Sequence, residues 1–343
     1  MANKTSNGGG LCVVTGGAGF IGSHLVEALL GIGWRVRVLD NFSSGHRKNI
    51  AHVASHPGFE LVEGDVADLA VAREAVRGAT RVFHLAALAD IVPSIQRPEE
   101  YYRSNVAGTF TILEAARSHG VSRFIYAASS SCYGIPVRYP TSENAPDDAR
   151  YPYALTKLLG EKLALHWCSV YGLPVVSLRL FNVFGPRSRT TGAYGAVFGV
   201  FLAQLRAGKP LTVVGDGEQR RDFTFVSDVV AAFMAAADSD VAGAVYNVGT
   251  SNPPSVNELV KLLGSPPTVG IPKRPGEPDM TWAETTRIKE ELGWAPKVSF
   301  SEGVKIMLSR IEDWRDAPVW TADSIAAATS DWFRYLSPGT KSD

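Results

Sequence analysis

The sequence predicts an α/β protein with a doubly wound parallel sheet and a smaller C-terminal lobe. Over the first half of its 343 residues, short β-branched apolar runs alternate with segments of helical periodicity. This pattern is typical of a parallel sheet covered by helices on both faces. Beyond Asn182, Gly, Pro and Arg become frequent and the predicted elements become shorter, while an apolar run at 244–249 is expected to return to the main sheet. The expected boundaries are residues 10–181 with 224–250 for the sheet domain, and 182–223 with 251–337 for the lobe.

The turn after the first predicted strand has the spacing of a dinucleotide-binding loop. Glycines at 16, 19 and 22 form G-x-x-G-x-x-G between an apolar run and a helical pattern that continues to Leu30. Gly16 permits the tight turn, Gly19 lets the backbone approach a pyrophosphate, and Gly22 lets the helix pack closely on the strand. The helix directs its free N–H groups and the positive end of its dipole at the phosphates. A Rossmann-type domain is therefore expected.

The second predicted strand ends in an acid that suits a ribose. Asp40 lies 18 residues after Gly22, where a ribose hydroxyl needs an acceptor. Because a carboxylate repels a 2′-phosphate, Asp40 favours NAD over NADP. Arg35 and Arg37 are expected to face solvent, and Arg47, in the polar loop that begins at Asn41, is the residue that would instead favour the phosphorylated form.

An acid also follows the third predicted strand, Phe59 to Glu63. Gly64, Asp65 and Val66 come at the carboxyl end of this strand, where ligands bind in such sheets. Asp65 is either an acceptor for the adenine amino group or the cap of the helix that runs through Val76. The sequence leaves both roles open.

The fourth predicted strand, Arg81 to Ala87, ends in Leu85, Ala86 and Ala87. These side chains would let a cofactor lie against the backbone. His84 lies inside the same apolar run, so we expect a buried, hydrogen-bonded histidine there and not a catalytic one.

The remaining elements follow the same alternation. A helical pattern from Asn105 to Ser118 is followed by Gly120 as the expected C-cap. The fifth and sixth strands are expected at 123–128 and 174–180, with a helix between them that contains Tyr153 and Lys157. From Pro253 onward, loops and two or three amphipathic helices are expected.

Tyr153 and Lys157 form the predicted chemical centre. Their i, i+4 spacing places both side chains on one helical face. Tyrosine is a useful base only if its pKa, about 10 in solution, falls towards neutrality. A lysine ammonium one turn away and a cationic nicotinamide would both stabilise the phenolate. Ser129, at the end of the fifth strand, would hydrogen-bond the same substrate oxygen; the alternative for this serine is a helix or turn cap.

The composition excludes several other classes of function. Lys plus Arg and Asp plus Glu both number 34. The chain therefore lacks the positive net charge that would indicate nucleic acid or an anionic membrane as a partner. No apolar run approaches the length of a membrane span, and residues 1–10 lack the apolar segment of a signal peptide. The three cysteines, Cys12, Cys132 and Cys168, show no metal or disulfide spacing. A cytoplasmic protein without a metal site is expected.

Taken in order, these motifs resemble the extended short-chain dehydrogenase/reductase family. The glycine fingerprint, Asp40, Ser129 and the Tyr153-x-x-x-Lys157 pair carry the resemblance. Within that family the chain is similar to the nucleotide-sugar 4-epimerases of the UDP-glucose 4-epimerase type, over nearly all of Leu11 to Leu308. The supporting segments are Asn105-Val106, Gly108-Thr109, Arg179 to Pro186, Gly215 to Val226 and Arg274 to Glu277.

The resemblance implies a role for each of these residues. Tyr153 is the base, Lys157 lowers its pKa and holds the nicotinamide ribose, and Ser129 assists at the sugar hydroxyl. The implied cofactor contacts are Gly16, Gly19, Phe20, Ile21, Gly22, Asp40, Asn41, Asp65, Val66, Leu85, Ala86, Ala87, Asn105, Tyr153 and Lys157. The implied substrate contacts are Ser129, Ser130, Ser131, Asn182, Arg221, Arg274, Glu277 and Thr281.

At the nucleotide end, Asn182 would contact the diphosphate and Glu277 the uridine ribose. Arg221 and Arg274 would clamp the phosphates, since guanidinium groups match phosphate oxygens bidentately. The alternative for Arg221, which precedes Asp222, is a structural salt bridge, and for Arg220 it is a solvated surface charge.

The residues after Ser129 help to choose the reaction. Sugar-nucleotide dehydratases carry Asp-Glu directly after this Ser or Thr, and decarboxylases usually carry Glu two residues after it. Here these positions are Ser130 and Ser131, and serine is not a general acid near neutral pH. Cys132 follows them; it is either a substitute acid or, as we expect, a buried apolar residue. Reversible oxidation at C4, with NAD retained, is therefore favoured.

The substrate and two other functions stay open. Thr281, seven residues after Arg274, occupies the position that is bulky and aromatic in hexose-restricted relatives, so a 2-acetamido sugar is expected to be tolerated. A uronic acid substrate is a further possibility. The alternatives to a 4-epimerase are a UDP-sugar dehydratase and, from a different class, a non-catalytic NAD-sensing protein.

Two expectations concern surfaces. The family commonly dimerises through two helices, here Thr109 to Ser118 and Tyr153 to Tyr171, and a homodimer is predicted. The aromatic tail, Asp313 to Ser337, lies beyond the clear resemblance. Its Trp314, Trp320, Trp332 and Phe333 are expected to pack against the body or a partner.

Overall fold

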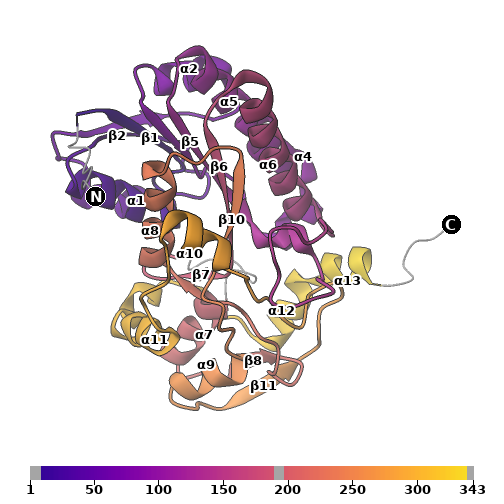
Figure 1. Ribbon diagram of the computed structural model, residues 1–343. Coiled ribbons are helices and arrows are strands. Elements are labelled where there is room, and N and C mark those ends of the chain that lie inside the picture. The colour runs from indigo at the N-terminus through magenta and orange to yellow at the C-terminus, as the bar shows by residue number, and fades with distance from the viewer. Residues whose placement is uncertain (1–8, 189–196, 338–343) are drawn as a thin grey trace.

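The computed structural model describes residues 9–188 and 197–337, so most of residues 1–10 and part of the Gly-, Pro- and Arg-rich stretch beyond Asn182 lie outside the described residues. Seven parallel strands form one sheet in the order β10-β6-β5-β4-β1-β2-β3 (Figure 1). The strands are β1 (Leu11–Thr15), β2 (Arg35–Asp40), β3 (Phe59–Glu63), β4 (Arg81–His84), β5 (Arg123–Ser129), β6 (Val175–Leu180) and β10 (Ala244–Val248). The doubly wound parallel sheet is confirmed.

Helices cover both faces of this sheet (Figure 1). On one face, α1 (Phe20–Gly31) packs against α8 (Val226–Asp238), and their apolar residues join those of the strands in one core. On the other face, α2 (Leu69–Val76), α5 (Gly108–Ser118) and α6 (Pro152–Tyr171) build the second core. The carboxyl ends of the strands are left uncovered by these helices, and the candidate site forms there.

A separate hydrophobic core organises the C-terminal half, and we call the elements around it the small lobe. Stacked and edge-on phenylalanines fill this core; the rings of Phe184 and Phe198 are 4.6 Å apart. Its elements are α7 (Val197–Arg206), β8 (Leu211–Val214), α9 (Val256–Leu262), β11 (Thr268–Ile271), α11 (Phe300–Ser309) and α12 (Ala322–Ala328). Two strands, β7 (Val183–Phe184) and β9 (Thr224–Phe225), pair where the chain enters and leaves the large sheet.

Three expected boundaries differ. The fourth strand ends at His84, because its register partner Thr15 is the last residue of β1 before the glycine loop. Helical structure starts before Asn105, since Pro98 begins α4 (Pro98–Tyr101), which continues through a π-helix at Tyr102–Ala107 into α5. Between residues 256 and 337 there are five α-helices, not two or three. Four of them, including α10 (Thr286–Leu292) and α13 (Ser330–Leu336), have seven residues, too few for a clear helical period.

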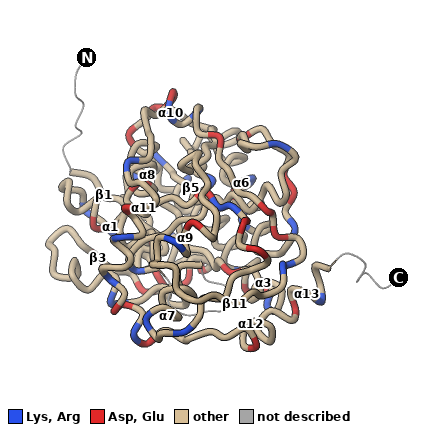
Figure 2. The backbone as a smooth tube through the Cα atoms, turned by 90° about the horizontal axis from the view of Figure 1, so that it is seen from below, with Lys and Arg blue, Asp and Glu red and all other residues tan. Residues whose placement is uncertain are grey.

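Charge and hydropathy agree with the composition. Acidic and basic residues are interspersed along the described chain, with no single-sign stretch standing out in the view of Figure 2. Within the described ranges, no helix has both the length and the apolar character needed to cross a bilayer.

Candidate active site

The strand ends open onto a cleft of about 460 Å³. Of the residues singled out in the sequence, its lining contains Gly16, Gly19, Phe20, Ile21, Gly22, Asp40, Asn41, Val66, Leu85, Ala86, Ala87, Ser129, Ser130, Ser131, Tyr153 and Asn182. The other residues singled out are not among those that line this cleft: Asp65, Asn105, Lys157, Arg221, Arg274, Glu277 and Thr281. One cleft thus joins the predicted cofactor loop to the predicted base.

The glycine loop forms a backbone cradle that fits a pyrophosphate. Gly16 has φ +70°, and a Cβ there would lie 2.8 Å from the amide nitrogen of Ala86. A Cβ on Gly22 would lie 2.2 Å from the carbonyl oxygen of Gly16. Both positions therefore require glycine, as the spacing predicted. Gly19 is the N-cap of α1, so the first N–H groups of the helix lie at the cleft beside backbone and not beside a side chain.

Asp40 is held in place for a ribose. Its carboxylate accepts from the backbone N–H of Ala18 at 2.9 Å and of Phe42 at 2.8 Å. Burial raises the pKa of Asp40, and these two hydrogen bonds oppose the rise. Arg47 is paired with Glu63, so its charge is already compensated. The nearby charges thus fit NAD better than NADP.

Of the other two arginines near β2, Arg35 is exposed as expected. Arg37 is not. Its side chain is largely buried, donates to the carbonyl oxygens of Ala75 and Arg77, and pairs with Glu60 at 2.9 Å.

Asp65 does not cap the helix through Val76. The N-cap of α2 is Asp68, whose carboxylate accepts from the N–H groups of Ala70 and Val71. Asp65 instead accepts from the N–H of Ala67 at 2.9 Å and pairs with Arg103 at 2.8 Å, and these contacts lower its pKa against a raising effect of partial burial. It lines a neighbouring hollow of about 350 Å³, so only the adenine role remains open for it.

His84 is buried and hydrogen-bonded on both ring nitrogens, as expected. Nδ1 lies 2.7 Å from the hydroxyl of Thr15, and Nε2 lies 3.0 Å from the hydroxyl of Thr109. Because Thr109 donates to the carbonyl oxygen of Asn105 at 2.6 Å, its oxygen accepts from Nε2–H, and Nδ1 accepts from Thr15. Burial lowers the pKa of His84 to about 3, so the ring stays neutral.

Asn105 lies behind the cleft wall and connects it to α6, the helix that carries Tyr153 and Lys157. Its side-chain oxygen accepts from the N–H of Leu88 at 2.8 Å, and its amide donates to the carbonyl oxygen of Leu88 and to Thr156. Thr156 in turn donates to the carbonyl oxygen of Tyr153 at 3.0 Å. In this structure Asn105 therefore positions backbone around the cofactor cleft.

Tyr153 lies in the wall of the cleft, at the N-terminal end of α6. Its enclosure raises the pKa of the phenol, a hydrogen bond with Ser129 lowers it, and the charge of Asp90 raises it further. The net direction is upward, opposite to our expectation that Lys157 would lower it. Ser129 fills the capping role considered for it, because it accepts from the N–H of Ser131 at 3.2 Å and caps the turn that follows. Its hydrogen bond to a substrate oxygen stays a prediction.

Lys157 is buried one turn further along α6. Its ammonium lies 4.5 Å from the ring centroid of Tyr126, a cation–π contact on β5. Burial lowers the pKa of Lys157 to about 7, and the charge of Glu161 opposes this. The tyrosine–lysine pair thus shares one helix face, as its spacing predicted, with the lysine beneath the surface of the cleft.

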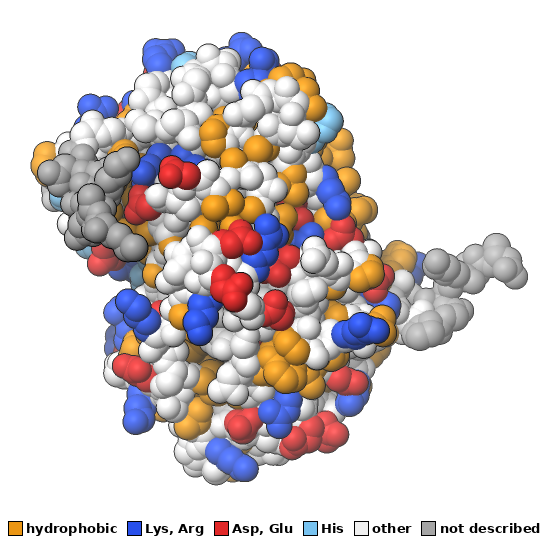
Figure 3. Space-filling view, viewed as in Figure 1, with side chains coloured by type: hydrophobic (Ala, Val, Ile, Leu, Met, Phe, Trp, Pro, Cys, Tyr) orange, Lys and Arg blue, Asp and Glu red, His pale blue; other side chains and the backbone are white. Residues whose placement is uncertain are grey.

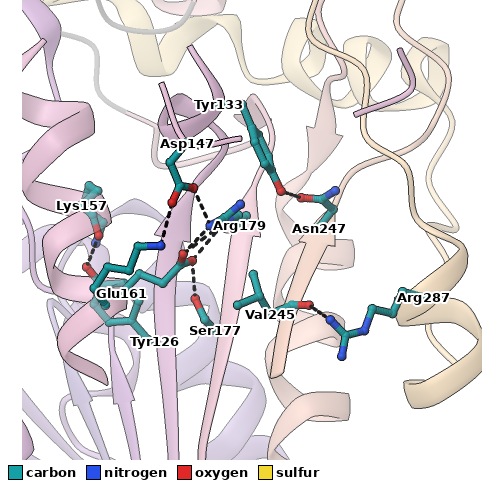
Figure 4. A network of polar contacts seen from close by, with 11 residues as sticks. Tyr126, Tyr133, Asp147, Lys157, Glu161, Ser177, Arg179, Val245, Asn247 and Arg287 are labelled. Carbon is teal, nitrogen blue, oxygen red and sulfur yellow. Dashed lines mark hydrogen bonds and ion pairs between the residues drawn. The ribbon is translucent and has the colours of Figure 1, made fainter. Parts of the chain in front are cut away.

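A buried ion pair that the sequence analysis did not single out fixes this helix to the sheet. Glu161 on α6 and Arg179 on β6 are 1% and 4% exposed, and they lie 2.6 Å apart (Figure 4). Ser177 donates to Glu161 at 2.8 Å, and Asp147 pairs with Arg179 at 3.1 Å. Glu161 follows Lys157 by one helical turn, which was the available signal.

The predicted phosphate clamp is a cluster of mutually paired charges. Glu277 lies between two guanidinium groups, 2.9 Å from Arg221 and 3.7 Å from Arg274. Arg221 thus forms a salt bridge, as in the alternative considered for it, with Glu277 as the partner. Asp222 instead accepts from the N–H groups of Thr250, Ser251 and Ala283. We call Arg221, Arg274 and Glu277 the clamp cluster.

Thr281 connects the clamp side to the cleft. Its hydroxyl donates to the side-chain oxygen of Asn182 at 2.7 Å and accepts from the N–H of Asp222 at 3.0 Å. Asn182 lines the cleft. The residue predicted to contact the diphosphate is therefore a direct neighbour of Thr281, the residue predicted to leave room for a 2-acetamido group.

The described residues show no cluster of three or more His, Cys, Asp or Glu that would hold a metal. The glycine cradle, the ribose acid and a tyrosine with a serine partner at the far end of one cleft define a nicotinamide-dependent enzyme that acts on an alcohol or ketone. The sequence model of the NAD dependent epimerase/dehydratase family matches residues 12–249. The chain belongs to this family, and its cofactor is NAD.

Relatives within the family act on UDP-sugars by different reactions. A UDP-glucose 4-epimerase of Mycolicibacterium smegmatis is 37% identical over 301 residues, 85% of this chain and 95% of the relative. UDP-glucuronic acid decarboxylase 1 of Arabidopsis thaliana is 35% identical, over 87% of this chain and 68% of the relative. The solved structure of a UDP-glucuronic acid 4-epimerase from Bacillus cereus, with UDP-glucuronic acid and NAD, has a TM-score of 0.82 at 31% identity, covering 88% of this chain and 99% of that one.

Proposed function

We propose that the protein is a UDP-sugar 4-epimerase. The observation that carries the proposal is the chemistry beside Ser129. Ser130 and Ser131 line the cleft there, and Cys132 is buried with its pKa raised by burial to about 12. None of these three side chains is an effective acid near neutral pH. Oxidation and reduction at one carbon, which needs only the tyrosine, is therefore favoured over elimination or decarboxylation.

In this mechanism Tyr153 moves a proton at the C4 hydroxyl oxygen of the sugar. The phenolate takes the proton as C4 is oxidised, and the phenol later returns it to the same oxygen, after the 4-keto sugar has turned so that C4 is reduced on its opposite face. Ser129, hydrogen-bonded to Tyr153, holds the same substrate oxygen in line. NAD, when bound, supplies a hydride acceptor beside C4 and a positive charge that favours the phenolate. Lys157, beneath the tyrosine, holds the nicotinamide ribose.

The large sheet domain and the small lobe bind different parts of the substrate. We propose that the large sheet holds NAD and the sugar ring, while the small lobe holds the nucleotide. Asn182 contacts the diphosphate at the boundary. Arg221 and Arg274 bind its phosphates, and Glu277 accepts from the uridine ribose. Because Glu277 pairs with both arginines, the diphosphate must take its place on at least one guanidinium group.

A 2-acetamido sugar fits beside Thr281. Threonine is small, and its hydroxyl is already bonded to Asn182, so it leaves room where an aromatic ring would not. Thr281→Tyr is expected to remove turnover of UDP-N-acetylglucosamine and to keep turnover of UDP-glucose. Thr281→Val is the control, since it keeps the volume and loses only the hydroxyl. An equal loss of turnover with both substrates in Thr281→Tyr would contradict the proposal that the size of residue 281 decides whether a 2-acetamido group fits.

The deciding experiment follows the products by NMR. The purified protein is incubated with NAD and either UDP-glucose or UDP-N-acetylglucosamine, without a reductant. Conversion of either sugar to its C4 epimer, absent in Tyr153→Phe, supports the proposal. If neither sugar reacts, a UDP-linked uronic acid is the next substrate; its C4 epimer would support a 4-epimerase, and a pentose product, formed with loss of CO2, would instead assign a decarboxylase.

A dehydratase is the second candidate, and Asp90 is the observation that favours it. This carboxylate lines the cleft and acts on the pKa of Tyr153, so it is placed where an eliminating enzyme needs an acid. A stable 4-keto product that disappears in Asp90→Asn would establish elimination and overturn the epimerase proposal.

We also propose a homodimer through α5 and α6. Five large apolar side chains on these helices are exposed: Phe110, Leu155, Leu159, Val170 and Tyr171. Hydrophobic atoms are seen along the upper right of Figure 3, on the side where Figure 1 draws α5 and α6. Sedimentation of Leu159→Lys is expected to give a monomer, and a wild-type protein that sediments as a monomer would contradict the proposal.

A further inference from the structure

We propose that Trp332, in the C-terminal tail, is a positioning residue that holds the clamp cluster and the start of the catalytic helix in place together. The proposal rests on the proposed function for the identity of the ligand at the clamp. It assigns a role to the tail, which the resemblance did not reach.

The tail crosses from the small lobe to the large sheet domain. On the lobe side, Ile325 of α12 lies in the lobe core, and Gln204 donates to the carbonyl oxygen of Trp320 at 2.8 Å. On the other side, α13 packs on α3 (Ile91–Gln96), where Gln96 donates to Asp331 at 2.9 Å. Figure 1 shows these two yellow helices running between the lower and upper parts of the molecule, and they lie together again in Figure 2.

Trp332 lies at the point where this tail passes the clamp. Its side chain is 1% exposed, and its indole N–H donates to the carbonyl oxygen of Pro275 at 2.6 Å. The guanidinium carbon of Arg274 lies 5.8 Å from the ring centroid. Pro275 stands between Arg274 and Glu277 in the chain, in a turn where Gly276 has φ +72°. The hydrogen bond therefore fixes the turn that carries two members of the clamp cluster.

The same indole ring contacts the catalytic side. Its centroid lies 6.3 Å from that of Tyr151, the N-cap residue of α6. The ring of Tyr151 lies nearly parallel to that of Tyr153, with centroids 6.4 Å apart and an interplanar angle of 11°. Tyr151 also hydrogen-bonds Ser131 in the cleft lining. A chain of three rings thus leads from the tail to the proposed base.

A second buried tryptophan in the tail separates this role from ordinary core packing. Trp314 is 2% exposed and belongs to the hydrophobic core of the small lobe. Trp332 contacts instead a loop carbonyl, an arginine and a tyrosine, all of which belong to the two ends of the substrate site. Replacing Trp314 should loosen the lobe, whereas replacing Trp332 should alter the site.

The test compares Trp332→Phe, Trp332→Ala and the control Trp314→Phe in the full chain with NAD. Trp332→Phe keeps a ring against Tyr151 and loses the N–H that bonds Pro275. We expect faster amide hydrogen exchange in 274–280 and about 3- to 10-fold weaker binding of UDP, the range for one lost hydrogen bond, with kcat unchanged and KM raised. Trp332→Ala, where it folds, should also speed exchange at 153–157 and lower kcat.

Two results would overturn the role of Trp332. One is amide hydrogen exchange at 274–280 that stays at the wild-type rate in Trp332→Phe. The other is faster exchange at 274–280 with weaker UDP binding in Trp314→Phe as well, which would indicate general loosening. Wild-type protein that does not bind UDP would contradict the proposed clamp. It would leave the exchange comparison to decide on Trp332 independently.

Discussion

The catalytic end of the cleft rests on the large sheet, whereas the clamp cluster rests on loops of the small lobe. Ser129 ends β5, and Tyr153 and Lys157 lie on α6, which the buried Glu161–Arg179 pair fixes to β6. Arg221 and Arg274 lie in loops, and both pair with the single carboxylate of Glu277. The catalytic end is thus held in place by the fold, and the clamp is held by contacts that a ligand has to rearrange.

This difference separates the effects expected at the two ends. Substitutions at the sheet end should change turnover or stability, because the side chains there are fixed and buried. Substitutions at the clamp should change substrate affinity and its dependence on salt, because part of each of these charged side chains reaches solvent, where ions screen charges. Four sets of substitutions test this separation.

The largest effect is expected at the base. Tyr153→Phe should lower kcat by about 10²- to 10⁴-fold, the usual contribution of a positioned acid or base, with KM and NAD affinity little changed. Steady-state kinetics and NAD titration measure this. Tyr335→Phe, an exposed tyrosine on α13, is the control and should behave as wild type. A large rise in KM for Tyr153→Phe would show that the two ends are not separable.

The ion pair beneath the catalytic helix should govern stability. Glu161→Gln leaves Arg179 buried with only part of its compensation, so the free energy of unfolding should fall by about 3–5 kcal/mol. The double variant Glu161→Met with Arg179→Met should recover most of this, because no charge is then left unpaired. Urea unfolding followed by circular dichroism measures both. Lys162→Gln, at the exposed end of the same network, should cost no more than about 1 kcal/mol.

At the clamp, Arg221→Met should act on binding. Loss of one charged hydrogen-bonding group costs about 1.5–3 kcal/mol, so KM should rise about 10- to 100-fold while kcat and the unfolding midpoint stay close to wild type. The neighbouring Arg220, whose guanidinium donates to the carbonyl oxygen of Pro253 and is 44% exposed, gives the matched control Arg220→Met. Equal effects of the two variants would remove the clamp from the proposal.

The smallest effects are shifts in pH dependence, and they have opposite signs. Activity should rise with pH as Tyr153 loses its proton. Enclosure raises the pKa of Tyr153, Ser129 lowers it and Asp90 raises it. Ser129→Ala should therefore move the rising limb of kcat/KM to higher pH, in addition to slowing the reaction, and Asp90→Asn should move it to lower pH. If the rising limb of kcat/KM moved in the same direction in both variants, a group other than Tyr153 would control it.

Features that depend on local backbone and helix geometry could be predicted from the sequence alone. The glycine spacing predicted a cradle whose Gly16 and Gly22 do exclude a Cβ, because a tight strand–turn–helix connection leaves no space for one. Asp40 and Tyr153 line the same cleft because Asp40 ends β2 and Tyr153 lies near the start of α6, which follows β5, and the carboxyl ends of parallel strands meet at one edge of a sheet. His84 was placed in the core by its apolar neighbours.

Which charges and rings meet across the chain could be read only from the folded protein. Asp65 pairs with Arg103, Arg221 with Glu277 and not with Asp222, and Trp332 with the turn at Pro275. The upward pKa of Tyr153 also depends on its enclosure and on Asp90, 63 residues away in the sequence. Such contacts join segments that are far apart in the chain, so no spacing or periodicity encodes them. Their energies depend on burial and distance, which exist only once the chain has folded.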